Sequence, residues 1–196
     1  MTLFRTMLCG LLLLSAVPTA QAADASTKFA LKGAGFLPCQ LFVAEREKRS
    51  NVYYLIGGWV EGYVSAYNQL TADTYDITSF ESLELLLGVI DNHCRANATD
   101  PLFRVVASIV NQISDDRIVA ESPMVEIAEG EAKTRLYRET IGRIQTALTE
   151  LGLYKDAIDG RWTDATRAAL IAFQSDIGFE TTGFPDQATL WRLLRK

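Results

Sequence analysis

The side chains with the most obvious chemical potential are one histidine and the cysteine beside it, His93 and Cys94. A zinc site needs about four converging nitrogen, sulfur or oxygen ligands, and the chain has no second histidine to contribute one. The G-x-S-x-G pattern of a hydrolase nucleophile is also absent from the sequence. We therefore expect no metal, no cofactor and no catalytic residue, and we interpret His93 as a histidine at a helix end.

Three aspartates near the C-terminus, Asp156, Asp159 and Asp164, raise the alternative of a glycoside hydrolase, which needs two carboxylates flanking a sugar. However, Asp159-Gly160 is a typical turn dipeptide, because the aspartate accepts backbone hydrogen bonds and the glycine adopts a positive φ. Asp164 suits the first turn of a helix, where the backbone dipole favours negative charge. Because these structural roles account for the acids, we expect a binding protein rather than an enzyme.

The elements that position these residues are predicted to be helices. Thr163 suits an N-cap, and Gly178 is typical of a residue that ends a helix. Between them, one helical face is formed by Trp162, Thr166, Ala169, Leu170, Phe173 and Ile177. An earlier apolar stripe predicts a helix over Ile141, Ile144, Leu148 and Leu151. A third helix is expected from near Pro185, with the apolar residues Leu190, Leu193 and Leu194.

Four motifs follow one another through this region, with turn glycines between them. They are I-x-x-I-Q-x-x-L-x-x-L-G-L-Y (Ile141 to Tyr154), I-D-G-R-W (Ile158 to Trp162), T-R-A-A-L-x-x-F-Q (Thr166 to Gln174) and T-G-F-P-D-x-x-T-L (Thr182 to Leu190). Residues from roughly 138 to 196 therefore resemble the three-helix peptidoglycan-binding-like domain. Thr163 departs from the pattern, since the family most often has glycine there, and we expect the loop to differ in shape.

The resemblance implies a peptidoglycan ligand and directs attention to the exposed loop before the second helix. The candidate ligand-binding residues are Asp159, Arg161, Trp162, Thr166 and Arg167. Arginine can pair with the carboxylates of stem peptides, and an aromatic face suits a sugar ring. Structural roles explain Asp159, Gly160 and Thr166 almost as well, so both interpretations stay open. Gln145 and Gln174 are expected to form hydrogen bonds with loop backbone.

Residues 1–22 have the pattern of a secretory signal peptide. Arg5 precedes an apolar run from Met7 to Val17, and Ala20-Gln21-Ala22 fits the small-x-small cleavage pattern, with cleavage after Ala22. The run is too short to span a bilayer. We therefore expect a periplasmic or secreted protein whose mature chain has no transmembrane segment and begins with a flexible lead-in over residues 23–36.

Cleavage would leave two thiols, Cys39 and Cys94, because Cys9 lies inside the apolar run. In an oxidising compartment, an even pair of cysteines most simply closes one disulfide. Two buried free thiols are the alternative, which would need a reducing compartment.

Composition and charge are those of an ordinary globular protein, with 48% hydrophobic and 22% charged residues. The chain has 19 basic and 24 acidic residues, and loss of Arg5 with the signal peptide changes the net charge from −5 to −6. An acidic chain without a basic run is a poor candidate for binding nucleic acid. The composition therefore argues against DNA and RNA as ligands and leaves protein and cell-wall ligands possible.

The middle of the chain also has helical periodicity, and we expect a helical domain over residues 37–115. Thr78-x-x-Glu81 suits a capping box for the third of its helices, which are expected to begin near Pro38, Ser50, Thr78 and Pro101. Residues 116–123 are a linker by composition. Within the final domain, 124–196, two short strands around Ala128 to Glu131 predict a β-hairpin before the first helix.

The helix predicted from Ser50 to Leu70 contains two unusual patterns. Each of its three glycines costs about 1 kcal/mol relative to alanine, so we expect close approach of another backbone at Gly57, Gly58 and Gly62. The helix also has an aromatic stripe formed by Trp59, Tyr63 and Tyr67. The stripe is either a binding surface or part of the core packing, and we prefer core packing.

The cysteine positions and the G-W-V-x-G-Y stretch (Gly58 to Tyr63) resemble small disulfide-bonded periplasmic helical domains of acid-stress chaperones and secretion-system immunity proteins. The expected fold is therefore mainly α, with two small helical domains, the second a three-helix peptidoglycan-binding-like bundle preceded by the hairpin. The expected function is that of an exported, non-catalytic, cell-wall-associated protein whose C-terminal domain binds peptidoglycan. That domain would position an N-terminal interaction domain, with another periplasmic protein as a second partner. The alternative is an inhibitor, immunity or acid-stress chaperone-like protein whose C-terminal domain binds a protein instead of the wall.

Overall fold

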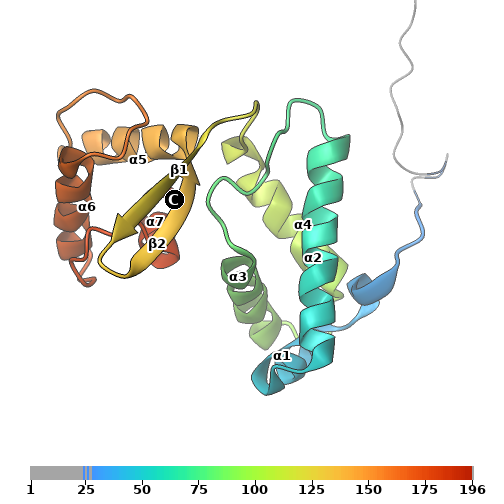
Figure 1. Ribbon diagram of the computed structural model, residues 1–196. Coiled ribbons are helices and arrows are strands. Elements are labelled where there is room, and N and C mark those ends of the chain that lie inside the picture. The colour runs from blue at the N-terminus through green and yellow to red at the C-terminus, as the bar shows by residue number, and fades with distance from the viewer. Residues whose placement is uncertain (1–23, 25, 27, 196) are drawn as a thin grey trace, which may run out of the picture. The chain divides into compact units, whose positions relative to one another are not determined.

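The computed structural model describes Asp24, Ser26 and residues 28–195 (Figure 1). The signal peptide predicted at residues 1–22 lies outside the described residues. The chain divides into two units, with the boundary between Leu31 and Lys32. In the first unit, the carboxylate of Asp24 accepts hydrogen bonds from the backbone N–H groups of Ser26 and Lys28. The described part of the second unit is mainly helical with one two-stranded sheet, as expected.

The first half of the second unit consists of four α-helices and two short 3-10 helices. The α-helices are α1 (Cys39–Lys48), α2 (Asn51–Leu70), α3 (Leu83–Ala96) and α4 (Leu102–Ile113). The 3-10 helices are η1 (Gly33–Phe36) and η2 (Ser114–Asp116). The hydroxyl of Ser50 accepts the backbone N–H of Tyr53 at 3.2 Å and so caps the first turn of α2.

The start of α3 differs from the predicted capping box. The helix begins at Leu83, where the hydroxyl of Ser82 accepts the backbone N–H of Leu85 at 3.2 Å. Thr78 instead donates its backbone N–H and its hydroxyl to a carboxylate oxygen of Asp76, at 2.9 and 2.8 Å. Glu81 is buried and binds a distant arginine. A local turn with Asp76 therefore takes Thr78, and a distant arginine takes Glu81, away from the capping role.

A disulfide between Cys39 and Cys94 joins the first residue of α1 to the last turn of α3, with Cα atoms 4.7 Å apart. The predicted pairing is therefore confirmed. The aromatic stripe of α2 packs against the apolar core beside this bridge. The rings of Trp59 and Tyr63 stack at 5.8 Å, and Tyr63 meets Phe103 edge-on at 5.9 Å. Core packing is therefore the role of the stripe.

The glycines of α2 have different surroundings. A Cβ at Gly57 would lie 3.3 Å from the Leu83 side chain, whereas nothing lies within 4 Å of the corresponding position at Gly58 or Gly62. The expected close approach therefore occurs at Gly57 alone, and the neighbour is a side chain rather than another backbone. The reason is that α3 packs on the face of α2 that carries Gly57, and the other two glycines face open space.

The C-terminal half begins with an antiparallel hairpin of β1 (Met124–Glu129) and β2 (Ala132–Tyr137), joined at Gly130 with φ +59°. The helices α5 (Arg138–Glu150), α6 (Asp164–Asp176) and α7 (Gln187–Leu194) follow, and Figure 1 labels all three around the hairpin. Both strands contribute inward-facing residues to one apolar core that they share with these helices. Its buried members include Ile127, Leu136, Ile141, Leu148, Leu170, Phe173 and Leu190. An isolated hairpin is marginal in water, and this packing stabilises it.

The third helix of this bundle begins at Gln187, later than the expected start near Pro185. Asp186 is its N-cap, because one carboxylate oxygen accepts the backbone N–H groups of Ala188 and Thr189 at 3.0 and 2.9 Å. A carboxylate at this position satisfies two backbone donors and also favours the helix dipole. Pro185 therefore lies before the cap instead of inside the helix.

The loop between α2 and α3 connects the two apolar cores of this unit. Phe80 belongs to the C-terminal core, although it precedes α3 in the sequence. The side-chain amide of Gln187 donates to the Phe80 carbonyl and accepts the Ser82 backbone N–H, both at 2.8 Å. In the segment predicted as a linker, Ile118 is fully buried and exchanges backbone hydrogen bonds with Asp76. Backbone pairing, side-chain contacts and core packing therefore join the two halves.

Candidate functional site

Two fully buried glutamines organise the loops of the C-terminal bundle. The side-chain oxygen of Gln145, on α5, accepts the backbone N–H groups of Asp159 and Gly160 at 3.1 and 2.9 Å. Its amide nitrogen donates to the carbonyl of Arg161 at 2.9 Å and lies 3.2 Å from the hydroxyl of Thr166. One side chain therefore sets the path of the loop between α5 and α6.

Gln174, on α6, does the same for the loop before α7. Its oxygen accepts the backbone N–H of Gly183 at 2.8 Å, and its nitrogen donates to the carbonyl of Phe184 at 3.1 Å. That nitrogen also lies 3.3 Å from the hydroxyl of Thr189. The prediction that Gln145 and Gln174 form hydrogen bonds with loop backbone is therefore confirmed.

The two loops share a seven-residue pattern that the sequence analysis missed. G-R-W-T-D-A-T (Gly160 to Thr166) and G-F-P-D-Q-A-T (Gly183 to Thr189) have glycine first, alanine sixth and threonine last. In both, the glycine has a positive φ, the fourth residue caps the next helix and the final threonine is fully buried. Alignment of these segments would have revealed that the second loop is equivalent to the first.

Thr163, the departure from the usual family pattern, is the N-cap of α6. Its φ is −126°, which any residue can adopt, so the position does not require glycine. Its hydroxyl accepts the backbone N–H of Thr166 at 3.3 Å. A threonine therefore fits this loop and supplies a cap that glycine would lack.

Among the predicted ligand-binding residues, Asp159 and Thr166 hold the loop together. Thr166 is fully buried. The carboxylate of Asp159 accepts the backbone N–H of Arg161 at 2.9 Å, and this hydrogen bond is the main cause that lowers the pKa of Asp159 below its usual value. The Arg161 side chain itself is 71% exposed, with its Nε 3.7 Å from Asp159. Arg161 is therefore the most accessible candidate of this loop.

Trp162 lies half-buried against the apolar core of the bundle. Its indole nitrogen is buried and has no hydrogen-bond partner among the described residues. The indole N–H of a buried tryptophan usually has a hydrogen-bond partner. Part of the ring surface is therefore used for packing, which limits the area that a sugar could cover.

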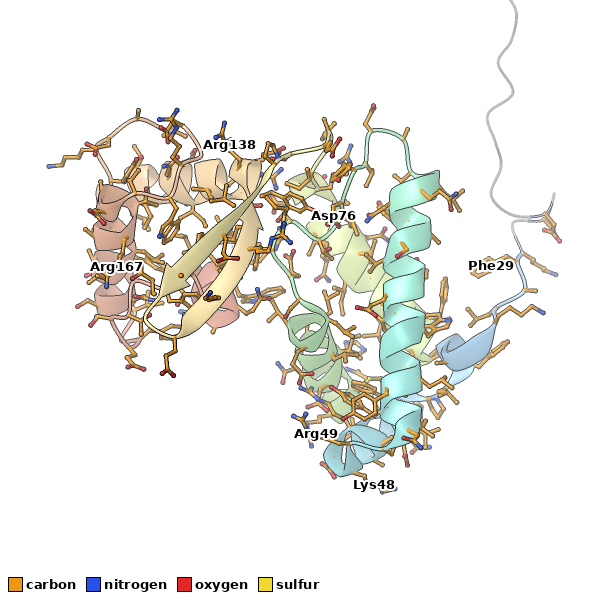
Figure 2. The ribbon with its side chains drawn as sticks, in the orientation of Figure 1. Phe29, Lys48, Arg49, Asp76, Arg138 and Arg167 are labelled. Carbon is orange, nitrogen blue, oxygen red and sulfur yellow. A yellow bond between two sulfur atoms is a disulfide. The ribbon has the colours of Figure 1, made fainter. Side chains whose placement is uncertain are left out.

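Arg167 lies on α6 (Figure 2), and it lines a surface pocket whose lining does not include Arg161. Its guanidinium Nε donates to Glu129 of the hairpin at 2.7 Å, and its Nη2 donates to the carbonyl of Thr182 at 3.4 Å. The aliphatic part packs over Gly183, where a Cβ would lie 2.8 Å from the Cγ of Arg167. The five predicted residues therefore divide between the Asp159 loop and the surface at Arg167.

An open groove of about 650 Å³ lies beside Arg167, and we call it the Arg167 groove. It is formed by the hairpin turn and the loop between α6 and α7, and its lining residues are Glu129, Gly130, Ala132, Arg167, Phe179, Glu180, Thr182, Phe184 and Asp186. Only Arg167 was predicted from the sequence. The seven-residue repeat could have directed attention to the second loop, which contributes most of the lining.

The remaining chemical groups considered from the sequence have structural partners. The Nε2 of His93 lies 2.9 Å from a carboxylate oxygen of Asp100, and Cys94 is in the disulfide. In the described part of the chain, no group of three or more histidine, cysteine or acidic side chains is arranged to hold a metal ion. No helix of the described residues is both long and apolar enough to cross a membrane.

Comparison with known proteins supports the C-terminal assignment. Residues 137–193 match the family model described as "Putative peptidoglycan binding domain". This segment begins at the end of β2 and includes α5, α6 and nearly all of α7. Comparisons of the chain with curated proteins and with solved structures found no match.

Proposed function

We propose that this is an exported, non-catalytic protein that binds peptidoglycan through its C-terminal domain and holds its N-terminal helical domain at the wall. The family match over residues 137–193 carries the proposal, because it covers the helical bundle and the loop that supply most of the lining of the Arg167 groove. The signal-peptide pattern before Ala22 adds support, since export would bring the protein to the polymer. The single histidine and the absence of a G-x-S-x-G pattern are compatible with a binding role.

Of the two surfaces that carry predicted residues, we favour the Arg167 groove as the wall-binding site. Ligand sites are usually concave and combine apolar surface with a few polar groups. The groove has both, because Phe179 and Phe184 line it together with Arg167. The loop of Asp159, Arg161 and Trp162 would be a secondary contact, since Thr166 and much of Trp162 are used by the fold.

The N-terminal domain is proposed to be a protein-interaction domain. Tyr54 and Leu55 on α2 are 59% and 62% exposed, and Gly58 and Gly62 leave the adjacent surface open. Glycines in a helix interior lower its stability, and packing within the chain explains only Gly57. An exposed face with apolar side chains and open glycines is therefore available to a second periplasmic protein.

The alternative is that the C-terminal domain has kept the fold and binds a protein rather than peptidoglycan. Fold alone does not establish a ligand, and the mixed charges of the Arg167 groove would also accept a polypeptide. The two alternatives differ in one measurable property, which is whether the protein binds purified peptidoglycan.

Co-sedimentation of the full mature chain with purified peptidoglycan tests the proposal. We expect the protein in the pellet, with a larger change in binding for Arg167→Ala than for Arg161→Ala. The two variants remove the same side-chain type from the two surfaces, and circular dichroism confirms that each is folded. If the unaltered protein stays in the supernatant at all pH values and salt concentrations, wall binding is wrong and the protein-partner alternative replaces it.

A further inference from the structure

The Arg167 groove is more acidic than a site for a neutral sugar polymer requires. Three carboxylates line it, from Glu129, Glu180 and Asp186, against the single cation of Arg167. Glu129 is paired with Arg167 at 2.7 Å. Asp186 uses its carboxylate to cap α7. Two negative charges of the lining are therefore not balanced within the groove.

Glu180 is the carboxylate that is most available to a ligand. Its side chain is exposed and forms no hydrogen bond or ion pair with the described residues. Its neighbour Phe179 is 38% exposed, and Phe184 is half-buried in the same lining. Aromatic faces attract ammonium groups and also pack against the methylene chain that carries them. The groove thus has an acidic group and apolar surfaces suited to an alkylammonium.

We infer that the Arg167 groove binds the primary ammonium group of the peptidoglycan stem peptide rather than the glycan strand. This inference rests on the proposed wall binding and adds the part of the polymer that is recognised. The acetylated sugars of the glycan are uncharged and gain nothing from the excess carboxylates. The diamino residue of an uncrosslinked stem peptide has a free ammonium group on an aliphatic chain. Glu180 is the expected ammonium partner, with the side chain of the diamino residue lying along Phe179.

The experiment is co-sedimentation of the full mature chain with three forms of the polymer. The first is intact peptidoglycan, the second is peptidoglycan whose free amines have been acetylated, and the third is glycan freed of stem peptides. We expect binding to the first, loss of most binding to the second and third, and weaker binding at high salt, because charge pairs near the surface are screened.

A matched pair of variants tests the residue assignment. Glu180→Gln should weaken binding to intact peptidoglycan by about threefold to fivefold, as expected for one partly exposed ion pair. Glu131→Gln removes the same charge from the exposed hairpin turn outside the lining and should bind as the unaltered protein does. Neither change removes a hydrogen bond or ion pair of the described residues, and thermal melting verifies that both variants fold.

The outcomes separate this inference from the proposed function. If acetylated peptidoglycan or bare glycan is bound as well as the intact polymer, ammonium recognition is wrong and wall binding stands. Equal binding by Glu180→Gln and Glu131→Gln would also overturn the assignment. If no form of the polymer is bound, the proposed function fails together with the inference.

Discussion

Replacement of Gln145 by methionine isolates the polar role of the buried glutamine. The two side chains have similar length, and methionine adapts to the shape of a core site. Gln145→Met would therefore keep most of the packing of α5 while it removes every hydrogen bond of the side-chain amide. The expected result is a folded protein with a loosened loop between α5 and α6 and a lower free energy of unfolding.

The magnitude follows from the groups that lose a partner. The backbone N–H of Gly160 is buried and would have no acceptor, at a cost of about 1–3 kcal/mol. The backbone N–H of Asp159 and the carbonyl of Arg161 each lose a hydrogen bond. Because they lie in exposed residues, water can replace part of that loss, at a net cost of about 0.5–1 kcal/mol each. We therefore expect a loss of roughly 2–5 kcal/mol, a large part of the stability of a typical domain.

Urea unfolding followed by circular dichroism measures this loss, and amide hydrogen exchange locates it. The amide of Gly160 should lose its protection, whereas the amide of Gly183 in the second loop should keep it. Gln112→Met is the control, because Gln112 is exposed on α4 and forms one long hydrogen bond of 3.5 Å to Ser108. It should change stability by less than about 0.5 kcal/mol. A loss below about 1 kcal/mol for Gln145→Met, or retained protection of Gly160, would refute the reasoning.

Three further predictions concern single features of the fold. Gly160→Ala should destabilise by about 2 kcal/mol or more, because φ is +69° and a Cβ would lie 2.6 Å from the backbone oxygen of the first residue of α5. Gly142→Ala, with nothing within 4 Å, should instead stabilise by about 0.5–1 kcal/mol, and urea unfolding of both checks the contrast. Reduction of Cys39–Cys94 should cost about 2–5 kcal/mol, measured by unfolding with and without dithiothreitol. Because the pKa of Asp159 is lowered in the folded protein, ionised Asp159 stabilises the fold at pH values above 3.8, the usual pKa of the group. This stabilisation is lost as the pH falls through the folded-state pKa. In Asp159→Asn, the urea concentration at the unfolding midpoint should therefore decrease less steeply as the pH falls below about 4. An unchanged pH profile would contradict this role of Asp159.

Local patterns predicted the elements well wherever the deciding contacts are local. The apolar spacing of α2, the hairpin around Gly130 and the Thr163 cap all depend on residues within a few positions of each other. The disulfide of Cys39 and Cys94 is a long-range contact, but the cysteine count and the expected compartment left few alternatives. The helical periodicity and the turn residues therefore sufficed for the fold class.

The errors occurred where distant residues compete for a side chain. Glu81 has the spacing of a capping box with Thr78, yet it binds Arg195, whose position depends on the whole C-terminal bundle. The Arg167 groove was missed for a similar reason, because it forms only when the turn at Gly130 meets the second loop. Spacing along α6 places Thr166 and Arg167 side by side, but one points into the core and the other into the groove.

The contacts between the two cores have a consequence for how wall binding would act on the N-terminal domain. A simple tether needs only a flexible linker, whereas here Phe80 is buried in the C-terminal core and the buried carboxylate of Glu81 is paired with Arg195. The guanidinium also lies over the Phe80 ring, at 5.1 Å from its centroid. Removal of the C-terminal domain would expose the apolar ring of Phe80 to water and leave Glu81 without its cation. A truncated chain would therefore lose stability together with any wall binding, so point variants of the full chain are the ones that separate the two effects. By the same contacts, the C-terminal bundle holds the loop before α3 in place, so the two halves are joined by packing and not by a flexible linker alone.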